Sequence, residues 1–254
     1  MIITVANQKG GVGKTDLAVN LSSHLAFLGK KILLIDLDPQ ANATDYLLPE
    51  KNKIKKTSAD LLISDKIRLQ DVVLETQIKN LHIVPGHHSL NAAQVELMND
   101  VGMQFRLKRK IRKTKSYDYI IIDTPPSLGM LTVNALTASD HVLVPVQTHY
   151  FATDGVEKLM STINAIKKEI NPKIDVKGYV LTMYDKRNKL SSAIEKLVRK
   201  KFGEKVLKTH IPVNVELTKA PIYHKPVILH SKSSRGAYAY MNLAKEFLSL
   251  YKDN

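Results

Sequence analysis

The chain of 254 residues contains no cysteine, and this absence removes several kinds of chemistry before any motif is considered. Without thiols there are no disulfide bonds, no thiolate nucleophile, and no zinc or iron–sulfur centre held by cysteine. No apolar run approaches the roughly 20 residues that cross a bilayer. The opening residues lack a basic segment followed by an apolar one, so we expect no signal peptide. We interpret the chain as soluble and intracellular.

Acidic residues are few compared with basic ones. There are 24 aspartates and glutamates against 38 lysines and arginines, which gives a formal net charge of +14. Such an excess favours polyanionic partners, nucleic acid before an anionic membrane surface. A lysine-rich proteome without any polyanionic partner is the alternative explanation. The hydrophobic fraction of 44% is ordinary for a globular protein with a full core.

Short apolar runs recur along the chain, and stretches with helical periodicity lie between them. Because these runs show no polar alternation, they are typical of parallel strands covered on both faces. Helical spacing is clearest at 14–28, with Gly29 as the expected C-cap, and at 155–169 and 191–201. The pattern predicts an α/β fold: a doubly wound, mostly parallel sheet flanked by helices on both faces. The predicted strands are 2–6, 31–36, 81–85, 117–123, 141–146 and 176–184.

A glycine-rich loop, "NQKGGVGKTDL" at residues 7–17, follows the first predicted strand. It departs from the strict phosphate-loop pattern because Gln8 stands where the first glycine is expected. The strand–turn–helix context still favours phosphate binding by free N–H groups at the helix start. We expect Lys14 to pair with the β- and γ-phosphates and Thr15 to offer its hydroxyl to Mg²⁺. A turn without a ligand is the alternative. The glycines that permit close phosphate approach are Gly10, Gly11 and Gly13.

At this loop the sequence resembles the ParA/MinD family of deviant phosphate-loop ATPases, whose signature "KGGVGKT" begins with a lysine. The resemblance implies that Lys9 reaches across an ATP-sandwiched dimer to the partner's nucleotide. The likeness continues through "LLIDLDPQANAT" (33–44), "YDYIIIDTPPSLG" (117–129) and the segment 209–248. It therefore covers nearly the whole chain, and within the family it is closest to short Soj-like partition proteins. It implies a single P-loop ATPase domain over residues 1–254.

The resemblance also indicates site residues beyond the loop. Asp38 follows a buried strand and matches the family's switch I, where a carboxylate can orient the attacking water near the magnesium. Asp123 ends an apolar strand, where a carboxylate is costly unless it serves a cation, here Mg²⁺ through water. Pro212 and Asn214 match the loop that holds the adenine. The expected nucleotide contacts are Lys9, Gly10, Gly11, Val12, Gly13, Lys14, Thr15, Asp16, Pro212 and Asn214. The expected catalytic residues are Lys9, Lys14 and Asp38, and the expected metal contacts are Thr15, Asp38 and Asp123.

The resemblance implies a partition cycle for a chromosome or a plasmid. ATP and Mg²⁺ drive formation of a homodimer, and the dimer binds DNA without sequence preference. A ParB-type partner then stimulates hydrolysis and release. On this interpretation the protein is cytoplasmic and nucleoid-associated, and it has no stable membrane anchor.

Two basic segments are candidates for contact with DNA phosphates. Arg187 matches a position where the family carries a DNA-binding arginine. The family's loop "IPRNVRLSEAP" reads "IPVNVELTKAP" here, so Val213 and Glu216 replace two arginines. The segment "RLKRKIRKTK" at 106–115 has seven basic residues and no acid; it is either a solvated helix face or a phosphate-binding patch. The candidates are Lys186, Arg187 and Lys189 in "DKRNKLS", and Arg199, Lys200 and Lys201 in "EKLVRKKFGEK".

One alternative function is a MinD-like ATPase that cycles on and off the membrane to regulate division-site placement. This function requires a basic amphipathic helix at the C-terminus. The tail instead carries few cations and places an apolar stripe on one helix face, which is typical of a helix packed on the core. That stripe consists of Ala237, Met241, Ala244, Leu248 and Tyr251.

A second alternative is a nucleotide-binding scaffold with impaired hydrolysis, and Asp16 is the reason for it. The family normally carries threonine or serine there, facing the α-phosphate. An acid in the first helical turn gains about 0.3–1 kcal/mol from the helix dipole. At about 5 Å from phosphate charge it loses roughly 3 kcal/mol at an effective dielectric near 20. We therefore expect Asp16 to weaken nucleotide binding while the fold is retained.

Overall fold

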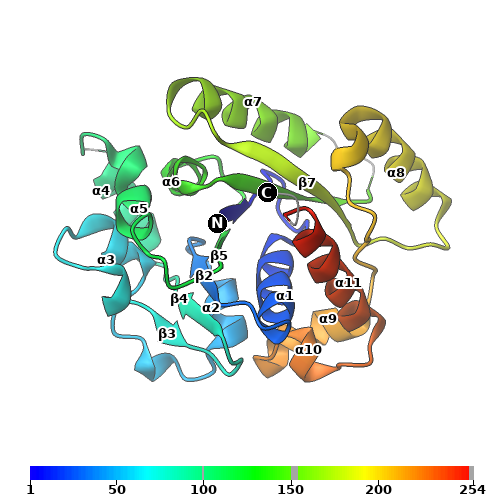
Figure 1. Ribbon diagram of the computed structural model, residues 1–254, viewed down its shortest axis with the longest axis horizontal. Coiled ribbons are helices and arrows are strands. Elements are labelled where there is room, and N and C mark those ends of the chain that lie inside the picture. The colour runs from blue at the N-terminus through cyan, green and yellow to red at the C-terminus, as the bar shows by residue number, and fades with distance from the viewer. Residues whose placement is uncertain (99, 150–153, 252–254) are drawn as a thin grey trace.

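The computed structural model describes residues 1–98, 100–149 and 154–251 (Figure 1). Within them, strands form one sheet in the order β3–β4–β2–β5–β1–β6–β7. Every neighbouring pair is parallel except β3–β4, which is antiparallel at the sheet edge. The strands are β1 (Ile2–Val5), β2 (Ile32–Asp36), β3 (Leu74–Glu75), β4 (Leu81–Val84), β5 (Tyr119–Asp123), β6 (His141–Gln147) and β7 (Asp175–Thr182).

Helices cover both faces of this sheet, which confirms the predicted α/β architecture (Figure 1). On one face α1, α2, α9, α10 and α11 share a core with the strands. On the other face α3 to α6 pack at one end and α7 and α8 at the other. The helices are α1 (Lys14–Phe27), α2 (Asn42–Leu47), α3 (Ser58–Ile63), α4 (Leu90–Leu97), α5 (Arg106–Ile111), α6 (Met130–Ala138), α7 (Asp154–Glu169), α8 (Lys189–Phe202), α9 (Val215–Lys219), α10 (Val227–His230) and α11 (Arg235–Ser249).

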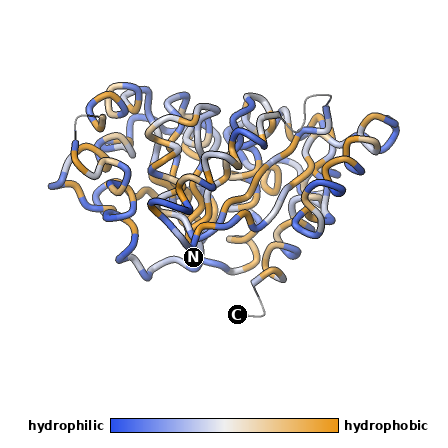
Figure 2. Tube along the Cα trace, turned by 90° about the horizontal axis from the view of Figure 1, so that it is seen from above, coloured by the Kyte–Doolittle hydropathy of each residue, from blue (hydrophilic) through white to orange (hydrophobic). Residues whose placement is uncertain are grey.

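The inner strand β2 shows why the apolar runs lack alternation. Ile32 and Leu34 join the core that contains α1, whereas Leu33 and Ile35 join the core on the opposite face. All four side chains are fully buried, since side chains of a strand point to both faces in turn. Figure 2 shows the same layering, with apolar strands inside and hydrophilic residues along the outer helices.

The six predicted strands and three predicted helices are all present, with ends shifted by one or two residues. Gly29 follows α1 with φ +86, and its N–H donates to the carbonyl of Ala26 at 2.9 Å. This left-handed residue ends the helix as predicted. Strand β3 was not predicted, because two residues are too few to show a period.

The C-terminal helix α11 packs on the core, as the sequence predicts, but its buried face is rotated from the predicted stripe. Ala237 and Ala244 are buried, whereas Met241, Leu248 and Tyr251 are only partly buried. The centre of the buried face is formed instead by Tyr240, Leu243 and Phe247, which the predicted stripe did not include. Among the helices of the described residues, none is long and apolar enough to cross a membrane.

Candidate nucleotide site

The glycine-rich loop connects the carboxyl end of β1 to the start of α1. Gly11 and Gly13 have φ values of +70 and +85, which side chains with a Cβ rarely adopt. A Cβ built on Gly10 or Gly11 would meet nothing within 4 Å, so the space above the loop is open. Thr182 holds the loop from β7, donating its hydroxyl to the carbonyl of Val12 at 2.8 Å. The loop is thus held on one side by β7 and is open on the side of Gly10 and Gly11.

Asn7 fixes the backbone of Lys9 and Gly155 leaves room for it, and neither residue was predicted from the sequence. Asn7 donates its amide to the carbonyl of Pro145 at 2.8 Å and accepts the N–H of Lys9 at 3.0 Å. A Cβ on Gly155 would lie 2.8 Å from the Asn7 amide oxygen and 3.1 Å from the Lys9 Cβ. A glycine at the start of α7 is therefore required for this close approach. The glycine alone, far along the chain, gives no signal of this role in the sequence.

Lys14 lies within the loop with only 6% of its surface exposed. Its ammonium donates to the carbonyl of Lys9 at 3.2 Å. Burial lowers its pKa, and the carboxylates of Asp123 and Asp38 act in the opposite direction. The structure therefore brings together three predicted site residues, one cation and two carboxylates, at the carboxyl ends of β1, β2 and β5.

Asp123 is a buried carboxylate without a proper hydrogen-bond partner. It ends β5 with no exposed surface, and both of its side-chain oxygens lack a partner. Burial raises its pKa well above the ordinary value, and Asp36 adds to the rise. The Thr15 hydroxyl, near but outside hydrogen-bond geometry, and Lys14 oppose it. A buried charge of this kind is costly unless a cation compensates it. Unpaired carboxylate oxygens close to a hydroxyl are a donor set that fits Mg²⁺.

Asp36 lies beside Asp123 in the sheet register but has a full set of partners. It accepts the N–H and hydroxyl of Thr44 at 2.9 and 2.6 Å, and the N–H of Asp38 at 3.1 Å. A Cβ on Gly86 would come within 2.7 Å of its carboxyl carbon. Burial raises its pKa, although the Thr44 bonds counteract this effect. Asp36 therefore holds the loop that carries Asp38.

Asp38 sits on the loop that Asp36 organises, with 6% of its surface exposed. Its carboxylate accepts the N–H of Gln40 at 2.9 Å, and its carbonyl accepts the N–H of Ala41 at 2.8 Å. These bonds close a turn before α2 and place the carboxylate close enough to affect Lys14 and Asp123. Its role with water or metal stays a prediction.

A cavity of about 650 Å³ adjoins the loop. The side chain of Asn214 caps α9 by accepting the N–H of Glu216 at 3.1 Å, and Pro212 pairs with Tyr184 in an isolated bridge. Both residues face the same space as Gly13, so the cavity has the position expected for a nucleoside next to a phosphate loop. Residues lining it include Gly13, Asp16, Thr148, Thr182, Pro212, Asn214 and Tyr240.

Asp16 lines this cavity and lies beside the Tyr46 hydroxyl. Burial raises its pKa to about 6, and the interaction with Tyr46 partly offsets the rise. Asn20 links the surroundings: its amide donates to the Asp16 carbonyl at 3.0 Å and to the Tyr46 hydroxyl at 3.4 Å. The carboxyl of Asp16, on α1, therefore lies next to Tyr46 of α2. The predicted weakening of nucleotide binding stays a prediction.

Comparison with known proteins identifies the family. The AAA domain family matches residues 1–176. The sporulation initiation inhibitor protein Soj of Bacillus subtilis is 46% identical over 96% of this chain and 97% of its own. The chromosome partitioning protein ParA of Caulobacter vibrioides is 41% identical over 99% and 95%. The chain is a Soj-like member of the ParA/MinD family. Members of this family are P-loop ATPases.

A solved structure supports nucleotide and magnesium binding within the family. Cobyrinic acid a,c-diamide synthase from Mycobacterium smegmatis, with bound ATP analog and magnesium, superposes with a TM-score of 0.86. It is 31% identical and covers 99% of this chain and 95% of its own. This ParA/MinD chain thus shares a fold that holds a nucleotide and Mg²⁺ in a relative.

The basic residues predicted to contact DNA lie on and before α8, but they differ in availability. Arg187 is 91% exposed and pairs with Asp185 at 3.1 Å. Arg199 turns inward, donating to Glu195 at 2.8 Å and to the carbonyls of Val206 and Leu207. Lys201 pairs with Glu157. Lys186, Lys189 and Lys200 are exposed. The structure thus gives Arg199 internal partners, while the other five cations face outward.

Proposed function

We propose that this chain is a ParA-type ATPase for DNA partitioning, which dimerises with ATP and Mg²⁺ and binds DNA without sequence preference. A ParB-type partner stimulates its hydrolysis of ATP. The observation that carries the proposal is the unpartnered carboxylate of Asp123, which faces Lys14 beneath an open glycine loop. Burying this carboxylate is costly unless a cation compensates its charge. We therefore expect a cation, together with phosphate groups on the loop, in this site.

The residues of the site divide the work of phosphoryl transfer. Free N–H groups of the loop and the ammonium of Lys14 hold the phosphates at the start of α1. Thr15, Asp38 and Asp123 are the residues that would hold Mg²⁺, directly or through water. When bound, the metal supplies positive charge that stabilises the transferring phosphoryl group. Asp38 orients the attacking water, because catalysis of this kind rests on positioning and electrostatics.

Lys9 completes the site of a second subunit in this proposal. Its backbone is fixed on both sides, by Asn7 through its N–H and by Lys14 through its carbonyl. Gly155 allows α7 to lie against it without a clash. Because this backbone is already fixed, only the side chain of Lys9 has to be ordered when its ammonium meets another subunit's nucleotide. The dimer is cytoplasmic and works on the nucleoid.

The DNA surface of this proposal consists of the outward cations before and along α8. Lys186, Lys189 and Lys200 need no rearrangement to meet phosphates, whereas Arg187 exchanges the partly exposed carboxylate of Asp185 for a phosphate. Exposed ion pairs are worth less than about 1 kcal/mol, so this exchange costs little. Binding through such contacts is independent of sequence and depends steeply on salt.

The test is an ATPase assay of the purified chain with Mg²⁺, alone, with random-sequence duplex DNA, and with a ParB-type peptide added. We expect slow basal turnover that rises when both are present, together with a mass increase from monomer to dimer on ATP addition. The matched control is Lys14→Ala, which should remove turnover and dimerisation together. Nucleotide binding without hydrolysis under every condition would support the scaffold alternative based on Asp16.

A further inference from the structure

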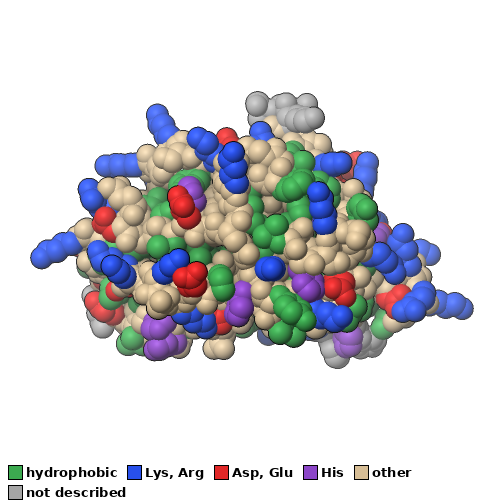
Figure 3. Space-filling view, turned by 90° about the horizontal axis from the view of Figure 1, so that it is seen from below, with side chains coloured by type: hydrophobic (Ala, Val, Ile, Leu, Met, Phe, Trp, Pro, Cys, Tyr) green, Lys and Arg blue, Asp and Glu red, His purple; other side chains and the backbone are tan. Residues whose placement is uncertain are grey.

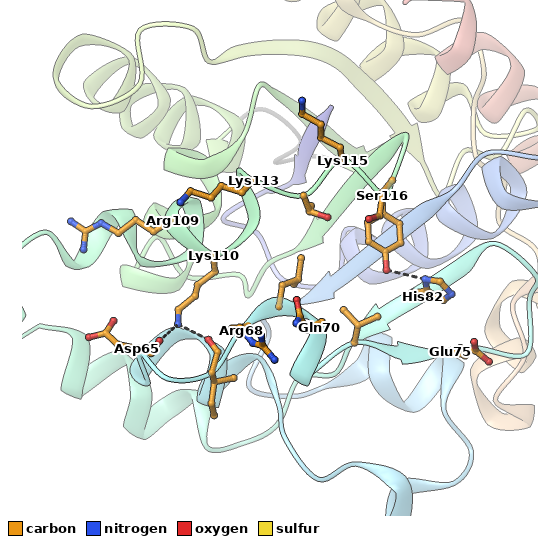
Figure 4. Close-up of a pocket in the computed structure, with 15 residues that line it drawn as sticks. Asp65, Arg68, Gln70, Glu75, His82, Arg109, Lys110, Lys113, Lys115 and Ser116 are labelled. Carbon is orange, nitrogen blue, oxygen red and sulfur yellow. Dashed lines mark hydrogen bonds between the residues drawn. The ribbon is translucent and has the colours of Figure 1, made fainter.

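A recess at the opposite edge of the sheet from the nucleotide site carries an unusual concentration of positive charge (Figure 4). Its volume is about 770 Å³. It lies where β4 and β5 begin, whereas the phosphate loop lies where β1 ends. Its charged walls comprise five basic residues, Arg68, Arg109, Lys110, Lys113 and Lys115, against two acidic ones, Asp65 and Glu75. The recess is therefore a separate site with a net positive lining.

Two cations of the basic segment 106–115 have clear structural roles. Arg106 pairs with Asp65 and with Asp100. The ammonium of Lys110 donates to the carbonyls of Ser64 and Ile67, both at 2.6 Å, just after α3 ends. These interactions explain Arg106 and Lys110 as residues that fix α5 against α3. The ion pair with Arg106 also compensates the charge of Asp65, one of the two acidic residues of the recess.

Arg68 also has a partner, since it pairs with Asp71 at 3.3 Å. The three remaining cations of the recess have no such explanation. Arg109, Lys113 and Lys115 are exposed, and within the described part of the chain none of them forms an ion pair or a hydrogen bond. Figure 4 shows Arg109 and Lys113 pointing to one side of the recess and Lys115 to another. Like charges gathered on one rim repel one another, and a polyanion that approaches the rim relieves this repulsion. Because the cations spread around a rim, they suit an extended polyanion better than a single small ion.

We infer that this recess and its rim form a second nucleic-acid-binding surface, which contacts the phosphate backbone through Arg109, Lys113 and Lys115. A duplex offers phosphates at regular spacing along a rod, and a recess with a basic rim accepts a rod. A flat bilayer fits a recess less well. Moreover, the apolar residues of the segment, Leu107 and Ile111, are buried in the core and offer nothing to insert.

The position of the surface gives it a distinct consequence. In Figure 1, α5 lies at one end of the molecule and α8 at the other. Figure 3 shows lysine and arginine side chains projecting at both ends of one face. With the α8 surface of the proposed function, the recess allows one molecule to hold two duplex segments. The inference deepens the proposed function, but its own contacts do not depend on nucleotide.

The experiment compares three triple variants of the full chain, each losing the same charge. The first removes the rim cations, with Arg109→Ala, Lys113→Ala and Lys115→Ala. The second removes the α8 cations, with Lys186→Ala, Lys189→Ala and Lys200→Ala. The third is a scattered control with Lys79→Ala, Lys158→Ala and Lys173→Ala, all exposed lysines without ion pairs among the described residues. Fluorescence anisotropy then measures binding to a labelled random-sequence duplex over a salt series, with and without Mg²⁺-ATP.

For the rim variant we expect about tenfold weaker DNA binding with and without ATP. The slope of log affinity against log salt should decrease by about two to three, since each lost phosphate contact removes about 0.9. The scattered control should lose at most about threefold. If the rim variant binds DNA as the control does, the inference is overturned. It is also overturned if the rim variant loses only binding to phosphatidylserine-containing vesicles.

The same variants separate this inference from the proposed function. If the rim variant loses DNA affinity while the α8 variant does not, the inference stands and the proposed α8 surface fails. If only the α8 variant loses affinity, the proposed function keeps its surface and the inference fails. Thermal unfolding of each variant confirms that the fold is intact, because all three rim side chains lie outside the core.

Discussion

Asp36 and Asp123 occupy equivalent places in the sheet yet have opposite surroundings. They are partners in the register of β2 and β5, each ends its strand, and neither has exposed surface. Asp36 accepts three hydrogen bonds from Thr44 and Asp38. Both oxygens of Asp123 lack a partner. Equal burial therefore conceals a difference: the Asp36 carboxylate organises a neighbouring loop, whereas we propose that the Asp123 carboxylate serves a cation.

The largest expected effect comes from Asp123→Asn. ATP turnover with Mg²⁺ should fall at least hundredfold, because the site loses the charge that compensates the metal. Stability without nucleotide should not fall, since the substitution removes a buried carboxylate whose oxygens have no hydrogen-bond partner. Turnover assays and urea unfolding in EDTA measure the two effects. A loss of stability above about 1 kcal/mol would mean that Asp123 supports the fold as Asp36 does.

Asp36→Ala should show the reverse pattern. Removing the carboxylate leaves the N–H groups of Thr44 and Asp38 and the Thr44 hydroxyl without an acceptor in a buried place. We expect the free energy of unfolding to fall by about 2–4 kcal/mol, because each abandoned donor costs about 1–3 kcal/mol and part is recovered by relaxation. Urea unfolding in EDTA measures this loss. Unchanged stability would contradict the role given to Asp36.

The contrast between these two aspartates marks the limit of what the sequence predicts. The apolar runs predict the sheet, because burial on both faces leaves a direct trace in composition. The motif positions predict that Lys14, Asp38 and Asp123 meet at one edge, since parallel strands end together. Hydrogen-bond partners and packing neighbours leave no such trace in the sequence. Thr44 is eight residues along the chain from Asp36, and Gly155 is far along the chain from Lys9. Short β3 was also missed, because two residues show no period. The buried face of α11 was centred wrongly although the helix is strongly amphipathic, because apolar residues also extend beyond the edge of its buried face.

Asp16 is an intermediate case between Asp36 and Asp123, because its carboxyl has one neighbouring donor, the Tyr46 hydroxyl. Asp16→Thr removes a negative charge from the cavity beside the phosphate loop. We expect ATP to bind about ten- to hundredfold more tightly, which corresponds to about 1.4–2.7 kcal/mol of relieved repulsion. Isothermal titration calorimetry measures the change, and Asp16→Asn is the control that removes charge without adding a hydroxyl. If neither variant binds ATP more tightly, the repulsion argument is wrong.

The smallest effect is the dependence of stability on pH that Asp16 produces. Its pKa is about 6 in the folded protein, against about 3.9 for an unfolded aspartate. The folded state therefore holds the proton more strongly, and the stabilisation is complete below about pH 4 and is lost as pH rises through 6. Between pH 5 and pH 7 the wild type should lose about 1 kcal/mol relative to Asp16→Asn, measured by urea unfolding in EDTA. The lowered pKa of buried His24 has the opposite effect on the pH dependence of stability. Because this effect is the same in the wild type and in Asp16→Asn, it cancels in the difference. A difference that does not vary with pH would place the Asp16 carboxylate in water, away from Tyr46.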